Sequence, residues 1–246
     1  MGRPTAWVLV AGLLTATLAA CASGPATRGA DDRVAASAGV GWASGAGAGA
    51  GAAPSATADP AEQAAVGDVW WRYLQAVRQR DGAAAAATVT AATLARYDGL
   101  RDAALHADRA VLERLPLTDQ LTVMVWRARV PVAVLRGGDA RALLASSVEV
   151  GLNGDGTSSG LADAVPDGDI AVGHYLRGTD GSMATVRFRR ESGVWRLDLR
   201  SLLDAAEAAT TRQWTQSGLV RGEFVARALA ADLTPAQVAQ AYAPPT

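Results

Sequence analysis

Cysteine and histidine, the side chains most often used as nucleophiles and metal ligands, are scarce in this 246-residue sequence. It has a single cysteine, Cys21, and two histidines, His106 and His174. These three residues do not form a zinc-ligand spacing. There is no Gly-x-Ser-x-Gly elbow, and no phosphate-binding glycine loop between a strand and a helix. We therefore expect no cofactor and no metal, and the chemistry that can be named most fully is that of Cys21.

Cys21 ends a segment with the three parts of an export signal: a charge at Arg3, a predominantly apolar run over residues 6–20, and small residues before the cysteine. The run is too short to span a membrane comfortably, which takes about 20 apolar residues. The motif Leu18-Ala19-Ala20-Cys21 resembles the lipobox of bacterial lipoproteins. That resemblance implies cleavage before Cys21, a diacylglyceryl thioether on its sulfur, and a location on the outer side of the cell membrane. The alternative is an ordinary cleaved signal in which Cys21 has no function.

Residues 21–60 are predicted to be a disordered tether behind the lipidated cysteine. Of the 39 residues from 22 to 60, 31 are Ala, Gly, Ser, Pro or Thr. Such a chain buries too little apolar surface to offset the entropy lost on ordering. The net charge of −1 is spread without a basic block, so we expect no nucleic-acid partner.

Residues 61–246 are predicted to form one α+β domain. Asp59 and Pro60 are typical of a helix start, and apolar residues at helical spacing predict a helix up to about residue 80. Trp70 and Tyr73 lie on its apolar side. They are either pocket residues or, as is commoner for aromatic residues at this spacing, core residues.

Two further helices are predicted over residues 83–115, the first ending by Tyr97-Asp98-Gly99. Residues 118–134 fit either a helix or a strand, and we favour the helix. Residues 140–150 are again helical. The polar neighbours of His106 favour a solvent-facing position on one of these helices.

After Gly160 the hydrophobic period changes to two, which predicts an antiparallel meander. Turn residues separate strands at 161–165, 170–177, 182–190 and 194–200. On the second strand, Ile170, Val172, His174 and Leu176 share a face that we expect the N-terminal helices to cover. Helices follow the sheet, with a break at Ser217-Gly218 and a capping box at Thr234–Gln237.

The segment Gly193-Val194-Trp195-Arg196-Leu197-Asp198-Leu199 is similar to a strand of the nuclear transport factor 2-like, ketosteroid-isomerase-type superfamily. The resemblance covers residues 61–205 and implies a cone-like fold, in which long helices pack on a twisted antiparallel sheet. A helical insertion near residues 117–152 and the helices after Ser201 depart from that pattern.

A cone-type isomerase needs a carboxylate base and a hydrogen-bond donor in an apolar pocket. By that resemblance the candidates are Asp198 as base and His174, Tyr73 or Tyr175 as donor. Strand alternation instead favours Asp198 as a salt-bridged residue beside Arg196 and Arg200. His174 is either catalytic or a buried, hydrogen-bonded histidine.

The sequence therefore predicts two alternative functions. The first is a membrane-anchored lipoprotein without enzymatic activity, whose domain binds an envelope protein partner or a small apolar molecule. The second is an isomerase- or dehydratase-like enzyme that uses His174 and an acid in the pocket of the cone.

Overall fold

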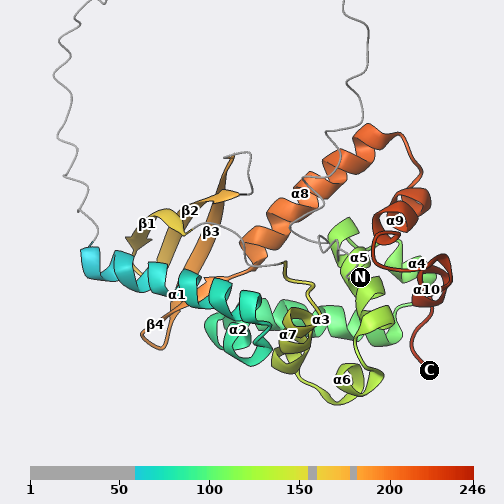
Figure 1. Cartoon of the computed structure of the whole chain (residues 1–246), viewed down its shortest axis with the longest axis horizontal. Helices are drawn as coiled ribbons and strands as arrows, with labels where there is room; N and C mark the ends of the chain where they lie inside the picture. The colour runs from blue at the N-terminus through green and yellow to red at the C-terminus, as the bar shows by residue number, and fades with distance from the viewer. Residues whose placement is uncertain (1–58, 155–159, 178–181) are drawn as a thin grey trace, which may run out of the picture. The chain divides into compact units, whose positions relative to one another are not determined.

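A computed structural model describes residues 59–154, 160–177 and 182–246 (Figure 1). The predicted export signal, Cys21 and the tether up to residue 58 lie outside the described residues. Helices come first, an antiparallel sheet follows, and further helices end the chain, which confirms the α+β class. The helices before the sheet are α1 (Pro60–Gln79), α2 (Gly82–Thr88), α3 (Ala91–His106), α4 (Arg109–Leu112), α5 (Leu117–Arg129), α6 (Val132–Gly137) and α7 (Ala140–Glu149).

Helix α1 begins and ends at the local signals of its sequence. The carboxylate of Asp59 accepts a hydrogen bond from the N–H of Ala61 at 2.9 Å, and Pro60 is the first helical residue. The helix ends where Arg80 takes a left-handed conformation with φ of 58°. The predicted helix over residues 60–80 is confirmed. Its buried stripe comprises Val66, Val69, Trp70, Tyr73, Leu74, Ala76 and Val77.

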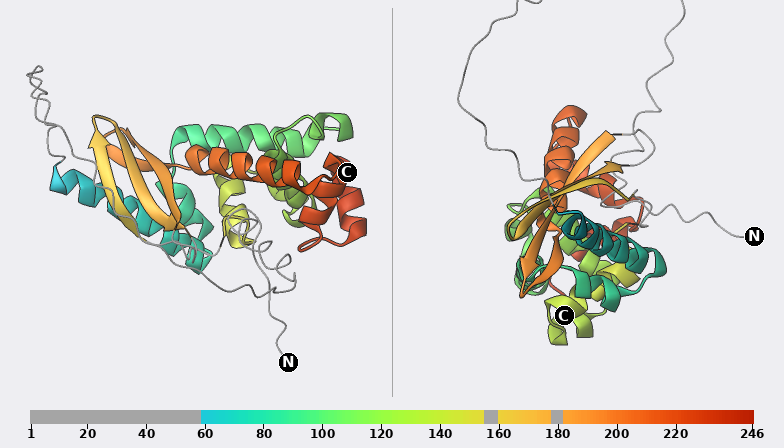
Figure 2. Two further views of the ribbon diagram at one scale, coloured as in Figure 1. Left: turned by 90° about the horizontal axis from the view of Figure 1, so that it is seen from above. Right: turned by 90° about the vertical axis from the view of Figure 1, so that its left-hand side faces the viewer.

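The predicted meander is also confirmed. The strands pair antiparallel with their neighbours in chain order: β1 (Leu161–Asp167), β2 (Ile170–Arg177), β3 (Ser182–Glu191) and β4 (Val194–Asp198). Helix α1 lies along one face of this sheet, as Figure 2 shows, and packs against β1 and β4. The indole N–H of Trp195 donates to Glu62 at 2.6 Å, which joins β4 to the first turn of α1.

The buried face of β2 is the opposite of the one that we predicted. Ile170, Val172, His174 and Leu176 point away from α1, and Ile170 and Leu176 are 46% and 44% exposed. The buried residues of β2 are Ala171 and Tyr175, which are 0% and 7% exposed, together with Gly173.

The register of the sheet explains this correction. Directly opposed residues of an antiparallel pair share a face. Ala171 lies opposite Phe188 and Gly173 opposite Val186, and these two β3 side chains are in the core. Ile170 instead lies opposite Arg189. The most apolar side of β2 is thus aligned with the charged side of β3, and the core lies on the other face.

The division of residues 83–115 was predicted incorrectly. Helix α2 ends at Thr88, and α3 runs through Tyr97-Asp98-Gly99 to His106. The chain is extended between them because Val89 forms a parallel bridge with Leu197 and the N–H of Thr90 donates to Leu197 O at 3.0 Å. Thr90 then caps α3 by accepting from the N–H of Thr93. A contact with distant β4 therefore sets this boundary.

Residues 117–129 form helix α5, which confirms the favoured interpretation of that segment. Pro131 separates α5 from α6, because the residue before a proline is disfavoured in the helical region. Helix α5 crosses the helical part of the domain and packs against α3, α8, α9 and α10. The predicted helix at 140–150 is confirmed as α7, which packs against α2.

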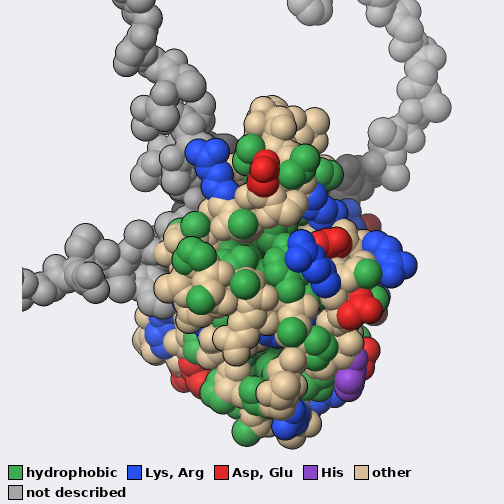
Figure 3. Space-filling view, turned by 90° about the vertical axis from the view of Figure 1, so that its right-hand side faces the viewer, with side chains coloured by type: hydrophobic (Ala, Val, Ile, Leu, Met, Phe, Trp, Pro, Cys, Tyr) green, Lys and Arg blue, Asp and Glu red, His purple; other side chains and the backbone are tan. Residues whose placement is uncertain are grey.

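The last strand is shorter than predicted, since β4 ends at Asp198 and helix α8 starts at Arg200. The helices after the sheet are α8 (Arg200–Ser217), α9 (Arg221–Leu229) and α10 (Pro235–Ala241). Gly218 ends α8 with φ of 67°, and Thr234 and Gln237 form the predicted capping box of α10. On the side that carries α9 and α10, hydrophobic side chains lie between charged ones (Figure 3).

Candidate functional site

His174, the predicted pocket histidine, lies on the outward side of β2 beside an acid of β1. Its Nδ1 is 2.7 Å from Oδ1 of Asp163, and its backbone N–H donates to the same oxygen at 3.2 Å. The two side chains are 37% and 53% exposed. His174 is therefore a surface residue held by an acidic neighbour, and α1 does not cover it.

His174 lies between apolar residues of β2 on the side of the sheet that faces away from α1. We call the outward side of β1, β2 and β3 the outer sheet face. Five apolar residues on it, which we call the apolar stripe, are Val165, Ile170, Val172, Leu176 and Met183. The polar row of Asp163, His174 and Thr185 divides the first three from the last two. Four of the five apolar side chains are between 44% and 54% exposed, and Val172 is half-buried. Single exposed apolar residues are common on soluble proteins, but several on one face indicate an interaction site.

Charged residues of opposite sign flank the apolar stripe. Asp163 and Asp167 lie on β1, and Arg187 and Arg189 lie on β3. Apart from the contact between Asp163 and His174, no ion pair joins these four side chains to any residue in the described part of the chain. From β1 to β3 the outer sheet face thus changes from acidic to apolar to basic, and β4 continues it with Asp198 opposite Arg187 and Arg196 opposite Arg189.

The predicted pocket residues Trp70 and Tyr73 lie in the core. They are 2% and 6% exposed. The ring of Trp70 is 4.9 Å from that of Tyr175 and 6.3 Å from that of Tyr73, measured between centroids. These three aromatic side chains fill the space between α1 and β2. Tyr175, the third candidate donor, is therefore also a core residue.

Two residues that the sequence analysis did not select form a polar cluster with Tyr73. The side-chain amide of Asn153 donates to the hydroxyl of Tyr97 at 3.2 Å and to that of Tyr73 at 3.4 Å. Burial raises the pKa of both tyrosines, so both phenols stay protonated at neutral pH. The cluster can donate hydrogen bonds but supplies no base. Tyr97 and Asn153 had resembled turn residues because each stands next to glycine or aspartate.

Asp198, the other candidate base, is paired with Arg200 as the salt-bridged interpretation predicted. Its Oδ2 is 2.6 Å from Nη2 of Arg200, and its Oδ1 accepts from the backbone N–H of Arg200 at 3.1 Å. Burial alone would raise the pKa of Asp198, but the hydrogen bonds from Arg200 outweigh it and keep that pKa below its usual value. This carboxylate therefore supports the start of α8 and is a poor proton acceptor.

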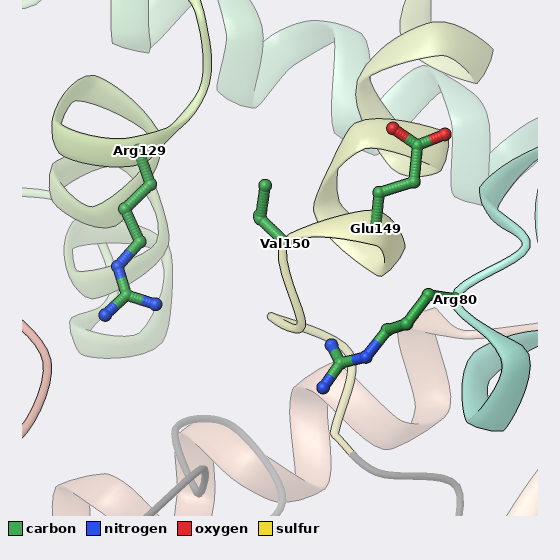
Figure 4. A pocket seen from close by; sticks show the side chains of 4 residues that line it. All are labelled: Arg80, Arg129, Glu149 and Val150. Atoms are coloured by element: carbon green, nitrogen blue, oxygen red, sulfur yellow. The ribbon is translucent and has the colours of Figure 1, made fainter. Parts of the chain in front are cut away.

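An open pocket of about 530 Å³ lies where three helices end, lined by Arg80, Arg129, Glu149 and Val150 (Figure 4). Nη1 of Arg80 donates to the carbonyl of Val148 at 3.3 Å. The guanidinium of Arg129 donates to the carbonyl of Asp232 at 2.8 Å.

Figure 4 shows that the carboxylate of Glu149 points away from the guanidinium groups of Arg80 and Arg129. Cations at helix C-termini stabilise the exposed carbonyl ends. The pocket arginines therefore have a structural function, and none of the four lining residues was predicted from the sequence as a site residue.

Among the described residues, no group of three or more His, Cys, Asp or Glu side chains is placed to hold a metal ion. None of the described helices is both long and apolar enough to cross a membrane. Comparison with protein-family models, with curated proteins and with solved structures finds no significant match to the chain.

Proposed function

We propose that this protein is a lipid-anchored lipoprotein on the outer side of the cell membrane, and that its outer sheet face binds a protein partner. The observation that carries the binding function is the apolar stripe of Val165, Ile170, Val172, Leu176 and Met183. Complete burial of a large apolar side chain contributes about 1.5–3 kcal/mol relative to full exposure. Covering side chains that are already half-buried in the fold would contribute about half of that for each residue.

A protein partner fits this surface better than a small apolar molecule. Small-molecule sites are concave and enclose most of the ligand. The stripe extends over three strands, and charged residues border it as polar residues border the core of a protein interface. Trp70 and Tyr73, which a ligand pocket under the sheet would have used, are packed against Tyr175.

The motif ending at Cys21 supports the membrane anchor. Two acyl chains on one residue hold a protein on a membrane much more firmly than one chain does, because each buried CH₂ contributes about 0.8 kcal/mol. The tether of residues 22–60 would then span on the order of 35 Å as a flexible coil. That length lets the outer sheet face meet another envelope protein.

A cone-like fold of the nuclear transport factor 2 type is part of this proposal. Its support is the strand Val194–Asp198 and the packing of α1 along one face of the meander. The isomerase-like alternative has less support. It needs an acid–base pair in an apolar pocket, whereas His174 lies on the outer sheet face and Asp198 is held by Arg200.

The anchor is tested by labelling producing cells with a palmitate analogue and by mass spectrometry of the mature N-terminus. We expect labelled protein in the membrane fraction and an acylated Cys21 as first residue. The variant Cys21→Ser should lose the label and leave the membrane fraction. An unmodified Cys21, or cleavage at another site, would refute the anchor.

The binding surface is tested with the photoreactive residue p-benzoylphenylalanine in place of Leu176, in the full-length chain in producing cells. Val220, which is 67% exposed and precedes α9, is the matched control position. Ultraviolet light should produce a covalent adduct with a protein from position 176 and none from position 220. If position 176 forms no adduct above the control, the outer sheet face is not a binding surface.

A further inference from the structure

The charges of the outer sheet face follow the rows of the sheet in a way that makes the face complementary to itself. Asp167 of β1 lies opposite Ile170 of β2, which in turn lies opposite Arg189 of β3. One row along, Val165, Val172 and Arg187 occupy the same three strands. In these two rows an apolar residue of β2 lies between a β1 residue and an arginine of β3, whereas the next row, Asp163, His174 and Thr185, is polar.

We propose that the partner of this face is a second copy of the chain, bound around a two-fold axis that runs along β2. This inference rests on the proposed function of the outer sheet face. Such an axis places β2 on β2 and reverses the order of the flanking strands, so that β1 of one copy lies over β3 of the other. Asp167 then meets Arg189 of the second copy, and by symmetry Arg189 meets its Asp167.

The same axis brings the apolar residues of β2 together. Ile170, Val172, His174 and Leu176 lie along the axis, so each lies over the same residue of the second copy. Two sheets packed face to face lie about 10 Å apart, which leaves room for these side chains between them. The charge pairs lie on both sides of the apolar centre and specify the register of the two copies.

The size of the face indicates a weak dimer. Strand β2 has eight residues, so the face is about 27 Å long and about 14 Å across its three strands, or roughly 400 Å² in projection. A standard interface buries about 800 Å² of accessible surface on each partner. Confinement of both copies to one membrane raises their effective concentration, so we expect the dimer mainly on the membrane.

Cysteine cross-linking of the full-length chain in native membranes tests this arrangement. In Val172→Cys the new thiols of two copies would face each other across the axis. A bis-maleimide that spans about 10 Å should link the two thiols and give a species of twice the mass of the mature chain. Val220→Cys and the wild-type chain, which contains only Cys21, measure the background. A dimer band no stronger than in these two controls would overturn the proposal.

Charge reversal in the Val172→Cys background tests the register independently. Asp167→Arg and Arg189→Asp each place like charges at both symmetry-related contacts, and each should lower the cross-linked fraction about tenfold. The double variant, Asp167→Arg with Arg189→Asp, restores both contacts and should recover the wild-type fraction. A double variant as weak as the two single variants would overturn the register.

The two experiments separate this inference from the function on which it rests. An adduct from position 176 that consists of two copies of the chain supports both. An adduct with a different protein, without a Val172→Cys dimer, overturns self-association and leaves the binding function in place. If position 176 forms no adduct at all, both are overturned.

Discussion

Glu207 of helix α8 caps the start of helix α5, and its removal should destabilise the domain. Its carboxylate accepts from the backbone N–H groups of Leu117 and Thr118 at 3.0 and 2.7 Å, and from the Thr118 hydroxyl at 2.7 Å. Residue Pro116 at the N-cap of α5 provides no side-chain bond of its own. The first N–H groups of a helix have no intrahelical partner. Glu207, which belongs to a helix distant in the sequence, therefore accepts the hydrogen bonds that a local N-cap side chain would otherwise accept.

We expect Glu207→Ala to lower the free energy of unfolding by about 2–3 kcal/mol at pH 7. The loss of an N-cap costs about 1 kcal/mol, and hydrogen bonds to a charged group contribute about 1.5–3 kcal/mol. Glu207→Gln keeps one acceptor oxygen without the charge and should lose less. Denaturant unfolding of the full-length chain, followed by circular dichroism, measures both values.

The pH dependence follows from the pKa of Glu207. Burial would raise this pKa, but the hydrogen bonds donated by Thr118 and Leu117 outweigh it and hold the pKa below its usual value. A lowered pKa in the folded state stabilises the fold above the unfolded pKa, near 4.3, and this stabilisation is lost as the pH falls further. The difference between wild type and Glu207→Ala should therefore be complete at pH 7 and shrink below about pH 4.

Asp68 provides the matched control for Glu207. It forms an exposed ion pair with Arg72 within α1, at 3.0 Å and with a side chain that is 62% exposed. Asp68→Ala should cost no more than about 0.5 kcal/mol. Equal losses for Asp68→Ala and Glu207→Ala would refute the capping function, and so would a Glu207→Ala loss that stays constant down to pH 3.

Two further predictions use the same unfolding measurement. Arg127 donates to four backbone carbonyls of α3, α10 and the residue after α3. Arg127→Met removes all four bonds, after which only the Ala103 carbonyl keeps another donor among the described residues, the N–H of Ala107, and should cost about 2–4 kcal/mol. Exposed Arg114→Met should cost under about 0.5 kcal/mol. A Cβ on Gly82 would lie 2.1 Å from the carbonyl oxygen of Ala145, so Gly82→Ala should force α2 away from α7 at a cost of about 1–3 kcal/mol. Gly99→Ala, where the space is open, should instead stabilise α3 by about 0.4–1 kcal/mol. Similar losses within either pair of variants would contradict these packing arguments.

Much of the secondary structure was predictable because its signals lie within a few residues of each other. Asp59 and Pro60 start α1, and Gly218 ends α8. Thr234 and Gln237 start α10 with a reciprocal cap. Each of these signals acts on backbone groups of its own turn. The boundary at Val89 was missed because its cause, a bridge to Leu197, is more than a hundred residues away in the chain.

The candidate site was harder to predict than the fold. The sequence identified His174 as a residue of interest on the most apolar side of β2, but not the direction that this side faces. Asp163, its partner on β1, was not selected, because only the pairing of β1 with β2 brings the two side chains within 2.7 Å. The capping function of Glu207 was equally hidden, since Thr118 and Glu207 are 89 residues apart in the chain.

The sequence alone therefore determined the α+β class, the meander and the alternation of residues between the two faces of each strand. It also contained the lipobox-like motif at Cys21, the basis of the proposed anchor. Only the tertiary structure decided which face of the sheet is buried. The physical reason is that all strands of a sheet share one buried face. The core residues Phe188 and Trp195 determine that face, and Ile170 and His174 are consequently directed outward.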